Sequence, residues 1–201
     1  MNDRVLRATL ALLLPAAFVP WPARAQYEDR EDLAEIALSG ETPESVILLW
    51  PAYSYRLARR MIARYGLPVD FTEDRVVWRD NGPWKRTVVY RSPPTDGLFR
   101  KTRGRLEQSV RYEFPKDRTA ALTEFDRTIE ADEKEGLLTA RTDDETSNLL
   151  ALNLADEVLR GRRTPKDAAE FRAKTARLRD SGKSAPYLER LLFVANPESP
   201  D

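Results

Sequence analysis

The stretch RVVWRDNGPWKRTVVY, residues 75–90, decides the fold class of this chain. Its two arms, residues 75–79 and 85–90, are rich in β-branched and aromatic side chains, which favour extended strands. Residues 80–83 (DNGP) lie between the arms and are of the types that form tight turns. The pattern predicts a β-hairpin, and a hairpin joins antiparallel strands.

Three further segments predict strands of the same kind. Residues 106–114 alternate loosely between apolar and polar side chains and predict a third strand. Residues 128–133 and 137–142 flank Glu135-Gly136 and predict a second hairpin. Because helical segments precede and follow these strands, we expect an α+β fold, with a small antiparallel sheet of about five strands and helices packed on one face.

Capping residues predict where the helices begin. Thr42-Pro43 and Thr164-Pro165 each place a Thr at the N-cap and a Pro at the first helical position. Thr142 and Glu145 have the spacing of a capping box for a helix that Gly161 would end. Helices are expected over residues 28–38, from Pro43 to a break near Trp50, and over 51–65, 115–125, 142–160 and 164–179, with a last short helix or strand over 186–193.

Residues 1–25 have the pattern of a secretory signal peptide. Arg4 and Arg7 precede an uncharged segment over residues 8–23, and the small residues Ala23 and Ala25 form a cleavage site. Prolines interrupt that segment, which is short for a membrane span; a retained N-terminal anchor is the alternative. The sequence therefore predicts a periplasmic or secreted protein, with one α+β domain over residues 26–194 and a disordered tail over 195–201.

Missing residue types exclude several chemistries. The 201 residues include no His and no Cys, which excludes a Ser-His-Asp triad, a thiol nucleophile, disulfides and zinc held by thiolate or imidazole. The 33 basic residues balance the 33 acidic ones, which argues against a general nucleic-acid-binding protein. The sequence contains no glycine loop for phosphate and no nucleophile motif, so we expect no cofactor.

Three stretches carry a resemblance to other proteins. They are WPAYSYRLARRMIARYG (residues 50–66), VVWRDNGPWKRTVVYR (76–91) and NLLALNLADEVLRGRRT (148–164). In this order they resemble an uncharacterised family of exported bacterial proteins, over residues 44–172. The resemblance implies export and a single domain. It carries over no activity, catalytic residue or ligand.

An arginine face is the first candidate site. At about 100° per residue, the helix expected over residues 51–65 places its apolar side chains on one side. Arg56, Arg59, Arg60 and Arg64 fall on the other side. Guanidinium groups bind phosphate, sulfate and carboxylate, so the expected ligands are anionic lipid headgroups, lipopolysaccharide phosphates or acidic glycans. The alternative is a solvated helix face that pairs with nearby carboxylates.

The tip of the first hairpin is the second candidate site, with Trp84 and Lys85 as its ligand-binding residues. A Trp beside a tight turn can be an exposed platform that stacks on sugars or on a partner's side chain. It can equally fold back over the sheet edge and close the core. The sequence leaves both readings open.

Acidic residues and one amide give weaker candidates. The carboxylates that crowd two loops and a helix start are Asp126, Asp132, Glu133, Glu135, Asp143, Asp144 and Glu145. They lack the pattern of a calcium loop, so no metal site is expected. A pair of them could hydrolyse a glycosidic bond if the fold held them about 5 to 10 Å apart. Asn148 falls on the apolar side of its helix, where we expect a structural hydrogen bond to a neighbouring backbone, with a ligand contact as the alternative.

Together these features predict an exported binding protein without enzymatic activity. Its partner would be an envelope protein or an anionic envelope component, either a glycan or a lipid headgroup. The ligand-binding residues would be Arg56, Arg60, Arg64, Trp84 and Lys85. The alternatives are a carboxylate-dependent hydrolase acting on a glycan and a structural subunit of an envelope complex. We expect no nucleic-acid partner and no transmembrane span once the signal peptide is removed.

Overall fold

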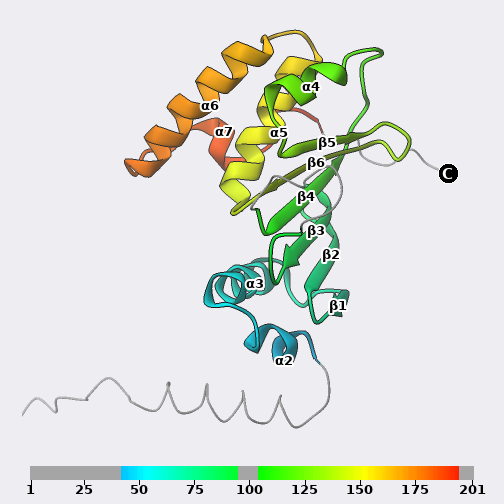
Figure 1. Ribbon diagram of the computed structural model, residues 1–201, viewed down its shortest axis with the longest axis vertical. Coiled ribbons are helices and arrows are strands. Elements are labelled where there is room, and N and C mark those ends of the chain that lie inside the picture. Colours follow the sequence, from blue (N-terminus) through cyan, green and yellow to red (C-terminus); the bar gives the residue numbers. More distant parts are fainter. Residues whose placement is uncertain (1–41, 95–103, 195–201) are drawn as a thin grey trace, which may run out of the picture.

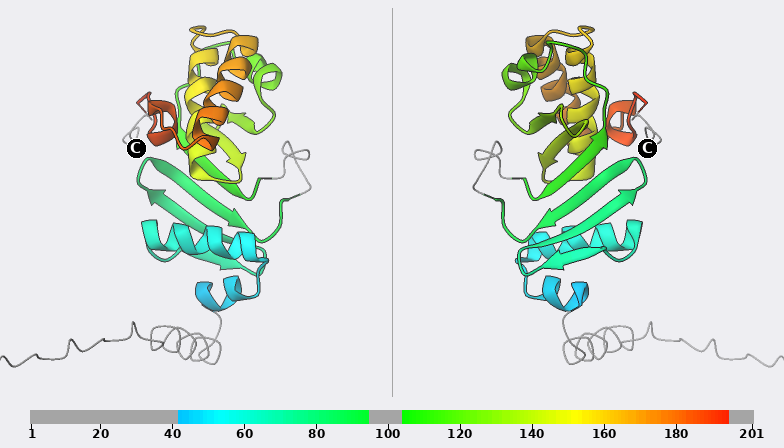
Figure 2. Two further views of the ribbon diagram at one scale, coloured as in Figure 1. Left: turned by 90° about the vertical axis from the view of Figure 1, so that its left-hand side faces the viewer. Right: turned by 90° about the vertical axis from the view of Figure 1, so that its right-hand side faces the viewer.

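A six-stranded antiparallel sheet forms the centre of the protein, in a computed structural model that describes residues 42–94 and 104–194. The strands are β1 (Asp70–Thr72), β2 (Arg75–Asn81), β3 (Trp84–Tyr90), β4 (Leu106–Arg111), β5 (Ile129–Asp132) and β6 (Leu137–Thr142). The helices are α2 (Pro43–Leu48), α3 (Ala52–Tyr65), α4 (Ala120–Phe125), α5 (Glu145–Leu159), α6 (Pro165–Asp180) and α7 (Pro186–Glu189). The helices lie on one side of the sheet (Figure 1, Figure 2), which confirms the predicted α+β class.

The predicted hairpin is present as β2 and β3. Its register pairs Arg75 with Tyr90 and Asn81 with Trp84. Gly82 in the turn has a φ of 72°, and Asp80 has a φ of 49°, in the left-handed region that Asp tolerates better than most residues. The turn residues therefore fit the backbone that they must adopt.

The sheet has one strand more than the sequence predicts. Its order is β1-β2-β3-β4-β6-β5, with every neighbouring pair antiparallel. The additional strand, β1, contains three residues at the edge of the sheet, which is too short for its side-chain pattern to stand out. Strands β5 and β6 form the predicted second hairpin.

Most helices begin and end near the predicted residues, with two corrections. Helix α4 begins at Ala120 rather than at Pro115. Helix α5 begins at Glu145, and its N-cap is Asp144, whose side chain accepts the backbone N–H of Ser147. The predicted capping box with Thr142 is therefore wrong, because Thr142 ends strand β6. Thr164 is the N-cap of α6, as predicted.

Two buried apolar clusters hold the layers together. One surrounds α5, which contacts the β4–β6 half of the sheet and helices α4, α6 and α7. The other lies between α3 and strands β2 and β3, and includes Leu57, Met61 and Trp78. Helix α5 is thus the central helix and α3 covers the opposite end of the same sheet face (Figure 2).

Some predictions fall on residues that the structure does not describe. They are the signal peptide over residues 1–25, the helix over 28–38 and the tail over 195–201, and most of the loop between β3 and β4 is likewise outside. Among the described helices, none has the length and apolar character to cross a bilayer.

Candidate functional site

The outward side of α3 carries four exposed arginines, and three of them have no carboxylate partner among the described residues. The opposite side of this helix buries Ser54, Leu57, Ala58 and Met61. Arg56, Arg59 and Arg60 are exposed, and from here on the name arginine face means these three residues without Arg64. No carboxylate of the described ranges, 42–94 and 104–194, lies within ion-pairing distance of any of them. The arginine face therefore presents three guanidinium groups to solvent on one stripe of a packed helix.

Arg64, one turn further along α3, has a different environment. Its guanidinium lies 2.8 Å from Glu145 Oε2 and above the ring of Tyr65. Its own side chain is 60% exposed, whereas that of Glu145 is 9% exposed. Arg64 neutralises a nearly buried carboxylate and is thus tied to the interior, unlike the arginine face.

The carboxylate of Glu145 is the centre of a polar network between α3, β3, β4 and α5. Trp84 Nε1 donates to Glu145 Oε1 at 2.7 Å, and Gln108 Nε2 donates to the same oxygen at 3.3 Å. The Tyr65 hydroxyl also donates to this oxygen. Burial raises the pKa of Tyr65 to about 12, and the hydrogen bond to Glu145 raises it as well.

Trp84 is a core residue and not an exposed platform. Only 1% of the surface of Trp84 is accessible. The hypothesis that this side chain is an exposed stacking platform is therefore wrong, and the alternative, that it closes the core, is confirmed. The reason is that the indole N–H finds a buried acceptor, Glu145 Oε1, on the other side of the helix–sheet interface. The partner lies 61 residues further along the chain, which no local pattern reveals.

Lys85 follows Trp84 but remains at the surface. Its ammonium lies 2.6 Å from Asp80 Oδ1, within the same hairpin. The side chain of Asp80 is exposed and that of Lys85 is partly exposed. The structure thus separates the two residues predicted at the hairpin tip, since one is buried and the other is held by a surface ion pair.

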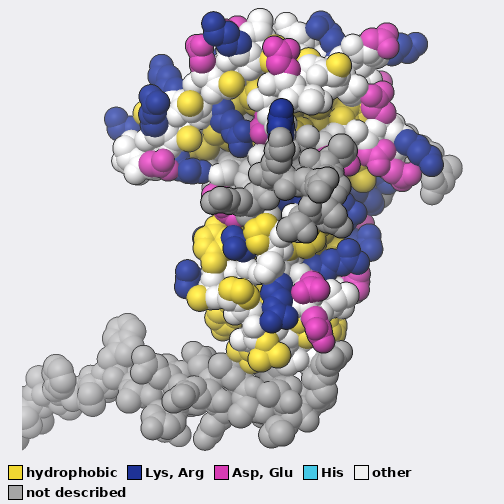
Figure 3. Space-filling model, viewed as in Figure 1, with side chains coloured by type: hydrophobic (Ala, Val, Ile, Leu, Met, Phe, Trp, Pro, Cys, Tyr) yellow, Lys and Arg dark blue, Asp and Glu magenta, His cyan; other side chains and the backbone are white. Residues whose placement is uncertain are grey.

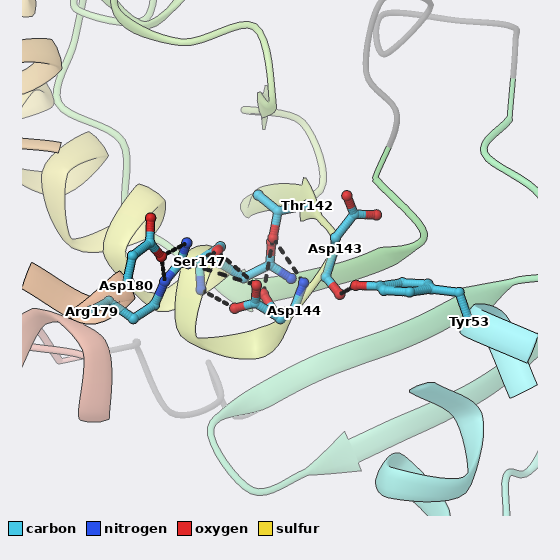
Figure 4. Close-up of polar contacts among 8 residues, drawn as sticks. Tyr53, Thr142, Asp143, Asp144, Ser147, Arg179 and Asp180 are labelled. Atoms are coloured by element: carbon cyan, nitrogen blue, oxygen red, sulfur yellow. Dashed lines mark hydrogen bonds and ion pairs between the residues drawn. The ribbon is translucent and has the colours of Figure 1, made fainter. Parts of the chain in front are cut away.

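A second polar cluster surrounds the start of α5 (Figure 4); the sequence indicated Asp143 and Asp144, but not the residues of α3 and α6 that contact them. The Tyr53 hydroxyl donates to the Asp143 carbonyl at 2.8 Å, which links α3 to the loop before α5. Arg179 of α6 donates to Ser147 Oγ at 2.6 Å and lies 3.7 Å from Asp144 Oδ2. The cluster joins α3 to the later helices α5 and α6.

A cavity of about 320 Å³ lies beside this cluster. Its basic lining residues are Arg141, Arg172 and Arg179, and its acidic ones are Asp143 and Asp144. Burial, together with repulsion by Arg179, lowers the pKa of Arg172. Arg172 also pairs with Asp126, and Arg141 pairs with Glu107. The charges around this cavity are largely compensated by the protein itself.

A larger cavity, of about 450 Å³, lies between α4 and β5. It is lined by Asp126, Glu130 and Glu133 and by the basic Arg127, together with apolar and hydroxyl side chains. Burial raises the pKa of Glu130, and the nearby carboxylate of Glu107 raises it further. Glu133 accepts a hydrogen bond from Thr119 at 2.7 Å. Among the described residues, no group of three or more acidic side chains is placed to hold a metal ion.

Asn148 has the structural role that the sequence indicated. It is fully buried, and its Nδ2 donates to the Leu106 carbonyl at 3.2 Å and to Gln108 Oε1 at 3.0 Å. Thr142 Oγ1 donates to Asn148 Oδ1 at 2.8 Å. The amide therefore ties α5 to β4 and β6.

Comparison with known proteins gives no further guide to function. No protein-family model matches the chain, and neither a curated protein nor a solved structure is significantly similar to it. The function must therefore be argued from the geometry of the surface and the cavities.

Proposed function

We propose that this chain is an exported, non-enzymatic binding protein that holds an anionic component of the cell envelope on the arginine face of α3. The observation that carries this proposal is the exposure of Arg56, Arg59 and Arg60 on one stripe, without a described carboxylate in reach. The export part rests on the signal-peptide pattern of residues 1–25.

The chemistry of the arginine face suits phosphate, sulfate or carboxylate. Each guanidinium offers several N–H donors in a fixed plane and can bind an oxyanion with two parallel hydrogen bonds. Arg59 and Arg60 follow Arg56 by three and four positions, so each of them is a neighbour of Arg56 on the helix surface. Because α3 is packed on the sheet through Leu57 and Met61, its backbone is already ordered before a ligand binds.

A calorimetric titration with inorganic polyphosphate tests this proposal. The test variant is Arg56→Gln/Arg59→Gln/Arg60→Gln. The matched control is Lys166→Gln/Lys174→Gln/Arg177→Gln, which removes the same charge from exposed positions of α6. We expect the test variant to bind on the order of 10-fold more weakly and the control to bind as the wild type does. Equal affinities for both variants would contradict the proposal.

A carboxylate-dependent glycan hydrolase is the second candidate function. The observation that favours it is the raised pKa of Glu130, a property of general acids, in a cavity that also holds Asp126 and Glu133. Its test is the release of reducing ends from envelope oligosaccharides. Glu130→Gln should abolish that release, whereas Glu124→Gln, at an exposed position of α4, should preserve it. Absence of hydrolysis by the wild-type protein would sink this candidate.

A further inference from the structure

Large apolar side chains are exposed at both ends of α3. Leu49, between α2 and α3, is 78% exposed. Leu67 and Val69, which follow α3, are 59% and 65% exposed. Tyr53 in the first turn of α3 is 38% exposed. Water-exposed side chains of this size favour transfer to an apolar environment.

The arginine face lies between these apolar ends. Helix α3 has 14 residues and is therefore about 21 Å long. Leu49 precedes the helix by three residues and Leu67 follows its last residue by two. Apolar and basic side chains lie together over α2 and α3 in Figure 3. The surface thus combines cations with apolar groups along the length of one helix.

This combination matches the boundary between lipid headgroups and acyl chains. Guanidinium groups bind the headgroup phosphates of an anionic leaflet, and exposed Leu and Val side chains enter the acyl region below them. A free polyphosphate or an acidic glycan would satisfy the arginines but would leave the apolar side chains in water. The apolar residues therefore favour a bilayer over a soluble anion.

We infer that the anionic component is the surface of an anionic phospholipid bilayer, on which α3 lies with Arg56, Arg59 and Arg60 at the headgroups and Leu49, Leu67 and Val69 inserted. The inference rests on the proposed function, because it names the partner of the same arginine face. It adds the apolar residues at the two ends of α3 as membrane contacts.

Co-sedimentation of the full chain with lipid vesicles tests the inference. The vesicles contain phosphatidylcholine alone, or phosphatidylcholine and phosphatidylglycerol in a ratio of about 2:1. We expect binding to the anionic vesicles, weakened when salt rises from about 0.1 M to about 1 M. Arg56→Gln/Arg59→Gln/Arg60→Gln should weaken binding on the order of 100-fold. Binding to the phosphatidylcholine vesicles includes any contribution of the apolar residues 8–23 and is subtracted from the binding to anionic vesicles.

The apolar contribution is measured with a second pair of variants. Leu49→Ser/Leu67→Ser should weaken binding to anionic vesicles about 10-fold or more and leave the affinity for polyphosphate unchanged. The matched control is Leu192→Ser/Val194→Ser, which removes exposed apolar side chains from the segment after α7 and should have no effect. Circular dichroism and the midpoint of thermal unfolding establish that each variant is folded.

The outcomes separate the inference from the proposed function. If the arginine face bound polyphosphate but the protein did not bind anionic vesicles, the inference that the partner is a bilayer would be overturned and the proposed function would stand. Equal binding of the Leu49→Ser/Leu67→Ser variant and the wild type to vesicles would overturn the insertion of these residues. If the Arg56→Gln/Arg59→Gln/Arg60→Gln variant bound both polyphosphate and anionic vesicles as tightly as the wild type, both proposals would be overturned.

Discussion

Single residues decide which predicted ligand contacts remain available. Arg56 and Arg64 are eight positions apart on one helix, yet of these two only Arg64 has a carboxylate partner within residues 42–94 and 104–194, namely Glu145. Trp84 points to the same carboxylate from β3. Sequence periodicity correctly places the arginines away from the core, but it cannot show that a carboxylate of α5 lies beside one of them. Glu145 is therefore the residue that divides the predicted site into an interior part and a surface part.

Replacing Glu145 by Ala should destabilise the protein. Trp84 and Tyr65 would lose a buried acceptor and Arg64 its partner, so we expect the free energy of unfolding to fall by about 2–4 kcal/mol. Urea denaturation measures the change. Glu145→Gln keeps one carbonyl acceptor and should lose less. Asp80→Ala, which removes the surface partner of Lys85, should change stability by about 1 kcal/mol or less. A Glu145→Ala protein as stable as Asp80→Ala would contradict this account of the network.

Tyr65 should make the stability depend on alkaline pH. Its pKa is raised from 10.0 to about 12 in the folded protein, so the folded state holds the phenol proton more tightly than the unfolded state does. This contribution is complete below pH 10 and is lost as the pH rises from 10 to about 12. We expect the stability difference between wild type and Tyr65→Phe to shrink across that range. Tyr90 also titrates there, so the variant is compared with the wild type at each pH. A difference that stays constant would contradict the assignment.

At the scale of elements, the sequence predicts the regular parts well. The hairpin over residues 75–90 and the N-cap at Thr164 follow from local turn and capping chemistry, and both are found. The burial of two polar residues of α5, Asn153 and Asp156, does not follow from local pattern. Asn153 bonds to the carbonyls of Tyr187 and Arg190, and Asp156 accepts from Tyr112. These partners lie in segments distant in sequence, and the periodicity of a single helix carries no information about such contacts.

The start of α5 offers a test of an element. Asp144 caps this helix and also lies beside Arg179 of α6. We expect Asp144→Ala to lower the free energy of unfolding by about 1–2 kcal/mol, measured by urea denaturation. Asp144→Asn keeps a side-chain oxygen for capping and should lose only part of that amount. An equal loss in the two variants would show that the charge, and not the cap, is what matters.

At the scale of the whole molecule, the two ends of one sheet face differ in how far their helices are enclosed. Helix α5 is enclosed by the sheet and by α4, α6 and α7, whereas α3 covers the other end of the sheet face and is open on its outer side (Figure 2). The balanced number of basic and acidic residues in the sequence does not show where on the surface unpaired charges lie. That location depends on which carboxylates the fold brings within reach of each arginine.

Protection of individual arginines from chemical modification tests the central claim most directly. The full chain is treated with phenylglyoxal in the presence and absence of inorganic polyphosphate, and each labelled arginine is quantified by mass spectrometry. Binding at the arginine face predicts that labelling of Arg56, Arg59 and Arg60 falls several-fold, while the exposed Arg177 of α6 is labelled equally in both samples. Protection of Arg172 and Arg179 with none on α3, or equal protection of Arg177, would contradict the claim.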